Sequence, residues 1–98
     1  MALLSDQDIA GRLAEVSDWR RDGDEIVRDL KFDDFAAAIA FVDTVAAAAE
    51  DANHHPDILV HGWNKVRLTL TTHSAGGLTD NDRQMAERID GLPLRPSP

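Results

Sequence analysis

The sequence contains no cysteine, so it can form no disulfide and offers no thiol chemistry. Basic residues are scarce, because ten Lys and Arg stand against eighteen Asp and Glu and the formal net charge is −8. A chain this acidic is not expected to bind nucleic acid or an anionic membrane directly. Long apolar runs are missing, as is a basic N-terminal region followed by an apolar stretch, so we expect a cytoplasmic protein.

The length of 98 residues indicates a single domain over residues 1–98. A chain of this size buries roughly 60–65% of its unfolded surface when it folds, which leaves a thin core. Self-association would bury further apolar area. Three prolines within residues 92–98 predict a loose C-terminal tail.

Hydrophobic spacing and turn residues predict an α+β fold. The expected elements are a helix from Ser5 to about Val16, a hairpin over 19–32, a helix over 33–51, strands over 57–63 and 65–72, and a helix from Thr79 to about Gly91. This α-β-β-α-β-β-α order is typical of helices packed on one face of a four-stranded antiparallel sheet.

The helix over 33–51 is the longest and is rich in alanine, which raises helix propensity and permits close approach of neighbouring elements. Its predicted buried stripe, at spacings of three and four, is Phe35, Ile39, Val42, Ala46 and Ala49.

Four histidines lie in one third of the chain: His54, His55, His61 and His73. Histidine titrates near neutral pH, so such a group suits a proton-transfer site or a metal site. Pro56 favours extended backbone at His55, and neighbouring side chains on an extended segment point in opposite directions. We therefore expect different roles for His54 and His55.

Alternation in the strand over 65–72 places Val66, Leu68 and Leu70 on the core face. His73 then leaves the strand on the polar face and at its end, either as a site residue or as a solvated surface histidine. We expect His61 to be a surface residue of the preceding strand.

Three carboxylates near the histidines have alternative interpretations. Glu50 and Asp51 end a helix, where the macrodipole disfavours negative charge, so either both are solvated surface groups or one of them faces His54 or His55. Asp82 follows Thr79 by three residues and resembles a capping box, a local role that would explain it without any site.

The spacing of these residues resembles the signature of the pterin-4a-carbinolamine dehydratases. The pattern is Glu50, three residues, His54-His55-Pro56, six residues, Trp63, nine residues, His73, eight residues, and Asp82. The likeness extends over about Ser5 to Leu92. Trp63 departs from the family, which more often has tyrosine there, although both residues are aromatic.

The resemblance implies the same fold, a homodimer or homotetramer, and dehydration of a 4a-hydroxytetrahydropterin to a quinonoid dihydropterin in tetrahydrobiopterin recycling. Such a hydro-lyase needs neither a cofactor nor a metal. The implied catalytic residues are His54 and His73 as acid and base, with His55 binding and orienting the substrate. The implied substrate-binding residues are Glu50, Trp19, Thr72, Ser74 and Asp82. From the sequence alone, the core is the favoured place for Trp19.

Two other classes of function are alternatives. A metal protein using the four histidines is disfavoured, because the chain has no helical i, i+4 histidine pair and no cysteine cluster. A non-catalytic binding module is the other alternative, since the family includes a member that also stabilises a transcription factor dimer. The intact histidine set favours catalysis.

Overall fold

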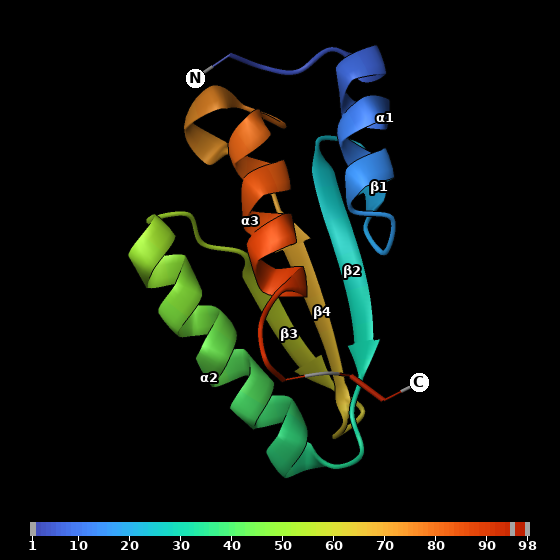
Figure 1. Ribbon diagram of the computed structural model, residues 1–98, viewed down its shortest axis with the longest axis vertical. Helices are drawn as coiled ribbons and strands as arrows, with labels where there is room; N and C mark the ends of the chain where they lie inside the picture. The colour runs from blue at the N-terminus through green and yellow to red at the C-terminus, as the bar shows by residue number, and fades with distance from the viewer. Residues whose placement is uncertain (1, 95, 98) are drawn as a thin grey trace.

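A computed structural model describes residues 2–94, 96 and 97 (Figure 1). Its elements are α1 (Asp6–Glu15), β1 (Arg20–Asp22), β2 (Glu25–Lys31), α2 (Phe35–Ala52), β3 (Asp57–His61), β4 (Lys65–Leu70), the 3-10 turn η1 (His73–Ala75) and α3 (Asp80–Asp90). The predicted α+β order is confirmed. The structure adds η1 where the sequence suggested a plain loop.

The four strands form one antiparallel sheet in the order β1-β2-β4-β3. The three α-helices cover one face of the sheet (Figure 1). Val66, Leu68 and Leu70 of β4 point to that side and are fully buried, as the alternation predicts. Among the described elements, none packs against the other face of the sheet.

The predicted buried stripe of α2 is wrong in part. Phe35 is 54% exposed and Ala46 is exposed, whereas Ile39 and Val42 are half-buried. The buried set is Ala38, Phe41, Val45, Ala48 and Ala49. Because α2 is apolar on nearly every side, two neighbouring stripes satisfy the helical period equally well, and packing on the sheet decides between them.

Capping residues begin and end the helices. Ser5 caps α1 by accepting from the Asp8 N–H, and Asn53 ends α2 in the left-handed conformation at φ 51°. Thr79 and Asp82 form the predicted capping box of α3. The reversal at Asn53 determines the direction in which the following histidines leave the helix.

The turn at 62–64 between β3 and β4 is anchored to the segment that follows β2. Gly62 and Trp63 both have positive φ, at 53° and 58°. Asn64 Nδ2 donates to the Phe32 carbonyl (3.0 Å), and the Phe32 N–H donates to the Asn64 carbonyl (2.8 Å). The turn is therefore fixed by hydrogen bonds to Phe32 as well as by the pairing of β3 with β4.

Across the described residues, no helix is both long enough and apolar enough to cross a bilayer.

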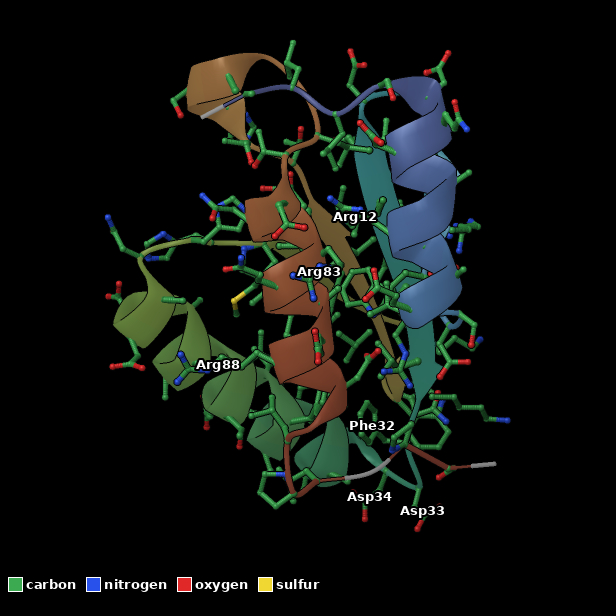
Figure 2. The ribbon with its side chains drawn as sticks, turned by 45° about the horizontal axis from the view of Figure 1, so that its top comes forward. Arg12, Phe32, Asp33, Asp34, Arg83 and Arg88 are labelled. Atoms are coloured by element: carbon green, nitrogen blue, oxygen red, sulfur yellow. The ribbon has the colours of Figure 1, made fainter. Side chains whose placement is uncertain are left out.

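Helices α1 and α3 are joined through Asp80. Its Oδ1 accepts from Arg12 Nε of α1 (2.9 Å) and from Arg83 Nε (3.0 Å), and its Oδ2 accepts from Arg83 Nη2 (3.0 Å) and Gln84 Nε2 (2.9 Å). Arg12 and Arg83 lie in the space between the two helices (Figure 2). Arg83 foremost, then Gln84 and Arg12, hold the pKa of Asp80 well below its ordinary value of 3.8, against an opposing effect of partial burial.

We predict that Asp80→Asn lowers the free energy of unfolding at pH 7 by about 1 kcal/mol, the upper range for exposed ion pairs. Because the folded-state pKa is depressed, this stabilisation is present above the unfolded pKa and is lost as the pH falls toward the folded pKa. The difference from wild type should therefore shrink below about pH 4. Urea unfolding at pH 7 and pH 3 measures it.

Asp43→Asn is the matched control, since Asp43 is exposed and makes no ion pair within the described residues. It should change stability little at either pH. An Asp80→Asn deficit that is equally large at pH 3 would contradict the role assigned to the charge.

Candidate active site

The candidate site lies at one end of the sheet, where the C-terminal end of α2, the 53–56 connection and the first turn of α3 meet. Figure 1 shows this connection running from the end of α2 to β3, on the side where α3 lies. The His54 N–H donates to the Ala49 carbonyl (3.2 Å), so the helix end itself fixes the backbone at His54. β3 then begins at Asp57, opposite Thr69 of β4.

Asp82 is the buried centre of this site, with only 1% of its surface exposed. Its Oδ1 lies 2.7 Å from His54 Nε2. Its Oδ2 accepts from the Thr79 N–H (2.9 Å) and from the Thr72 hydroxyl (2.9 Å). A buried carboxylate is costly unless it is hydrogen-bonded, and here both oxygens have partners.

The direction of these hydrogen bonds follows from the donors available. Because the Thr72 hydroxyl donates to Asp82, its oxygen must accept the Thr79 hydroxyl proton across their 2.8 Å contact. Thr79 Oγ1 in turn accepts from the Asn81 N–H (3.3 Å). An ionised carboxylate only accepts, so His54 Nε2 is the donor to Asp82. His54 Nδ1 is then the ring nitrogen left to exchange a proton.

The His54 ring borders a small cavity of about 160 Å³ between α2 and α3. The other lining residues are Ala52, Asn81, Gln84, Met85 and Arg88. Arg88 reaches from α3 toward α2 (Figure 2) and pairs with Asp51 at 2.8 Å. The cavity thus places amide groups and a guanidinium next to an imidazole that a buried carboxylate orients.

His55 has a separate partner, as its opposite direction on an extended segment predicts. Its Nε2 lies 2.8 Å from Glu50 Oε2. Of the two alternatives for Glu50, the structure therefore pairs it with His55 and leaves His54 to Asp82. The side chains of His55 and Glu50 are 55% and 78% exposed, so this pair adds little stability but remains accessible to a ligand.

His73 and Ser74 belong to η1 and are exposed. The His73 ring borders a second cavity of about 380 Å³, together with Asp22, Asp24, Glu25, Thr71, Gly76 and Gly77. The two rings of His54 and His73 therefore line different cavities. They are linked through Thr72, which precedes His73 and donates to Asp82.

Trp19 lies away from this group. It is 3% exposed, belongs to the hydrophobic core, and donates through Nε1 to Asp90 Oδ1 (2.9 Å). Asp90 is eight residues beyond Asp82 in α3, a distance of about 12 Å along the helix axis. His61 is an exposed residue at the far end of β3, as expected.

Part of the site has no signal in the sequence. Thr79 is the helix cap that the sequence predicts, but its hydroxyl and its N–H also support Asp82. Asn81, Gln84 and Arg88 gave no sequence signal beyond their place on the polar side of α3. The described residues contain no group of three or more His, Cys, Asp or Glu arranged to hold a metal ion.

Comparison with known proteins gives a consistent set of relatives. The profile of the family described as "Pterin 4 alpha carbinolamine dehydratase" matches residues 2–92. A Nocardia farcinica protein provisionally named for this family is 56% identical over 90 residues, covering 92% of this chain and 94% of that protein. A similarly named Haloarcula marismortui protein is 48% identical over 90 residues, covering 92% and 95%.

Solved structures agree with the sequence comparison. A Brucella melitensis crystal structure titled "transcriptional coactivator/pterin dehydratase" superposes with a TM-score of 0.85 at 32% identity, covering 91% of this chain and 96% of that one. A pterin dehydratase-like protein described as a RuBisCO assembly factor in the alpha-carboxysome gives a TM-score of 0.62 at 31% identity, covering 74% and 84%. By sequence and by fold, this chain belongs to the pterin-4a-carbinolamine dehydratase family.

Proposed function

We propose that the protein is a hydro-lyase that dehydrates a 4a-hydroxytetrahydropterin to a quinonoid dihydropterin. The observation that carries this proposal is the His54–Asp82 pair, in which a buried carboxylate orients an imidazole that borders a cavity. Family membership supplies the substrate class. Tetrahydrobiopterin recycling beside an aromatic amino acid hydroxylase is the matching physiological role.

The reaction requires two proton transfers. The C4a–O bond breaks as a proton reaches the departing hydroxyl, and a proton leaves a ring nitrogen of the pterin, so that water is the only other product. Imidazoles suit both transfers at neutral pH. His54 would act through Nδ1, while Asp82 holds Nε2–H and stabilises the imidazolium that forms when His54 accepts a proton.

His73 is the proposed second acid–base residue, and His55 with Glu50 the proposed substrate-orienting pair. Both histidines are exposed and lie near the same end of the sheet as His54. In the arrangement described, the His73 and His54 rings border separate cavities. Joint action on one substrate therefore requires the ligand to bridge the region around Thr72, whose hydroxyl already contacts Asp82.

A non-catalytic binding module is the second candidate. It is favoured by one comparison: a structural neighbour at 31% identity is described as a RuBisCO assembly factor. The first test therefore measures dehydration itself. Turnover no faster than the spontaneous reaction would remove the enzyme proposal and leave the binding module.

We predict that His54→Ala and His73→Ala each lower kcat by about 10²–10⁴-fold with the fold retained, since that is the usual contribution of a general acid or base. His55→Ala should act mainly on KM, because it removes binding that is uniform between ground and transition states. Steady-state kinetics of 4a-hydroxytetrahydropterin dehydration, with circular dichroism to verify folding, measures these effects.

His61→Ala is the internal control, because His61 lies on the surface at the far end of β3. It should leave kcat and KM nearly unchanged. Damage by His61→Ala as large as that by His54→Ala would show that the roles are assigned wrongly.

We also predict that Thr72 is a positioning residue for the His54–Asp82 pair. Thr72→Val removes one donor to Asp82 while keeping the side-chain shape, and should lower kcat by about tenfold with little change in KM. Thr72→Ser restores the hydroxyl and should restore kcat. A slowly exchanging His54 Nε2 proton should be visible by NMR in wild type and in Thr72→Ser, and should exchange faster in Thr72→Val.

If Thr72→Ser is as impaired as Thr72→Val, the methyl group matters and the hydroxyl does not, which would contradict this role. A neutral His54 that carries its proton on Nδ1 would contradict the direction of the hydrogen bonds derived above.

We predict a homodimer or homotetramer. Large apolar side chains remain exposed on α2, on the edge strand β3 and on the turn after it, at Phe35, Leu59 (52%) and Trp63 (62%). Burying them between copies would compensate for a thin core. Light scattering at micromolar concentration tests the assembly. A stable, well-folded monomer there would contradict it, and Phe35→Asp should shift the distribution toward smaller species.

A further inference from the structure

The only two lysines in the chain, Lys31 and Lys65, lie directly opposite each other in the sheet. Lys31 ends β2, Lys65 begins β4, and His61 of β3 is the next register partner of Lys65. All three side chains point to the face that the helices leave open, because Leu30 and Val66 beside them point to the core. Directly opposed residues have Cβ atoms about 4.5–5.5 Å apart, and like charges in this arrangement destabilise a sheet.

Within the described residues, no carboxylate forms an ion pair with either lysine. Asp29 is the nearest acidic residue on the same face, but its carboxylate binds Arg67 Nε (2.7 Å) and Arg20 Nη1 (2.8 Å). Arg67 foremost, together with Arg20, lowers the pKa of Asp29 below its ordinary value, as expected for a carboxylate already committed to two guanidinium groups.

The two lysines border a cavity of about 530 Å³, which we call the lysine cavity. Its lining residues are Asp18, Arg28, Asp29, Leu30, Lys31, His61, Lys65, Arg67, Pro96 and Ser97. Four of the ten basic residues of the chain therefore line it, against two of the eighteen acidic residues. In a chain of net charge −8, this is a local reversal of sign.

The walls of the lysine cavity are held by the backbone. The Ser97 N–H donates to the Lys31 carbonyl (2.7 Å), which brings the C-terminal segment against the end of β2 (Figure 1). A Cβ atom at Gly62 would lie 3.4 Å from Lys65 Nζ, so the missing side chain leaves room for the ammonium to lie over the turn. Both features position Lys31 and Lys65 through the backbone, so that neither ammonium group is needed for these contacts.

We propose that the lysine cavity binds a small oxyanion, namely inorganic phosphate or a phosphomonoester, between the ammonium groups of Lys31 and Lys65. An ammonium is a compact point charge with three donors and is a common phosphate ligand. The ring N–H of His61, the register partner of Lys65, is a third donor. A bound dianion would remove the repulsion between the lysines, whereas the acidic remainder of the surface disfavours a long polyanion.

This site is independent of the proposed dehydratase activity. Lys65 and His61 lie at one end of the β3–β4 pair, where β3 ends and β4 begins. The His54–Asp82 pair lies at the opposite end, because His54 comes shortly before Asp57, the first residue of β3. Binding at Lys31 and Lys65 and turnover at His54 can therefore be measured and can fail separately.

The test is a titration of the full chain with inorganic phosphate in a background of about 0.1 M NaCl, where the Debye length is about 10 Å, followed by amide chemical shifts. Saturable shifts are expected at Lys31, His61 and Lys65. Lys31→Gln and Lys65→Gln should each weaken binding by about tenfold, and the double variant should abolish it. A parallel titration with glycerol 3-phosphate distinguishes a phosphomonoester, if it binds more tightly, from the free ion.

Arg21→Gln is the matched control, because it changes the net charge equally but pairs with Asp6 and lies outside the lysine cavity. It should change the affinity for phosphate less than about twofold, since surface charges beyond a Debye length are screened. Equal weakening by Arg21→Gln and Lys65→Gln would mean non-specific attraction and would overturn the proposal. So would the absence of saturable shifts at tens of millimolar phosphate.

Thermal unfolding supplies a second readout. Phosphate should raise the Tm of wild type more than that of the Lys31→Gln/Lys65→Gln double variant, because the double variant keeps the general effect of an excluded salt and loses the binding to the folded state. Without phosphate, the double variant should be at least as stable as wild type, since it loses a like-charge pair. An equal rise of Tm in both proteins would contradict a site at the lysines.

Discussion

The burial of one carboxylate, Asp82, is the constraint on which the rest of the structure depends. An ionised carboxylate in the interior is costly unless every lone pair that faces the protein finds a donor. The donors come from the end of β4 (Thr72), the cap of α3 (Thr79) and the connection after α2 (His54). Satisfying Asp82 therefore fixes three separate segments relative to one another. Fold and candidate site therefore depend on the same set of hydrogen bonds.

Much of the fold could be predicted because its signals are local. Helix caps at Ser5 and Thr79, the left-handed stop at Asn53, and the alternation in β4 all depend on residues within a few positions of each other. The buried face of α2 could not be predicted in this way. An alanine-rich helix is apolar on nearly every side, and only the sheet beneath it selects Phe41 and Val45 over Phe35.

The site followed a similar division between local and long-range information. The cluster of histidines indicated His54 and His55, the resemblance to the dehydratase signature selected Glu50, and extended geometry predicted that the two histidines take different partners. The choice of partner needs the folded chain, because His54 and Asp82 are 28 positions apart. The same holds for Trp19, whose indole finds Asp90 at a separation of 71 positions. No local pattern distinguishes an indole that lines a pocket from one that closes the core.

The turn at 62–64 limits how many residues the β3–β4 hairpin can contain. It joins strands whose two ends carry unrelated chemistry, the His54 connection at one end and His61 with Lys65 at the other. Side chains alternate with a period of two, so one inserted or deleted residue would turn the whole of β3 over against β4. Asn64 is also bound to Phe32, so the turn cannot absorb the change by bulging outward. The number of residues between His54 and Lys65 is therefore constrained by the register of β3 against β4.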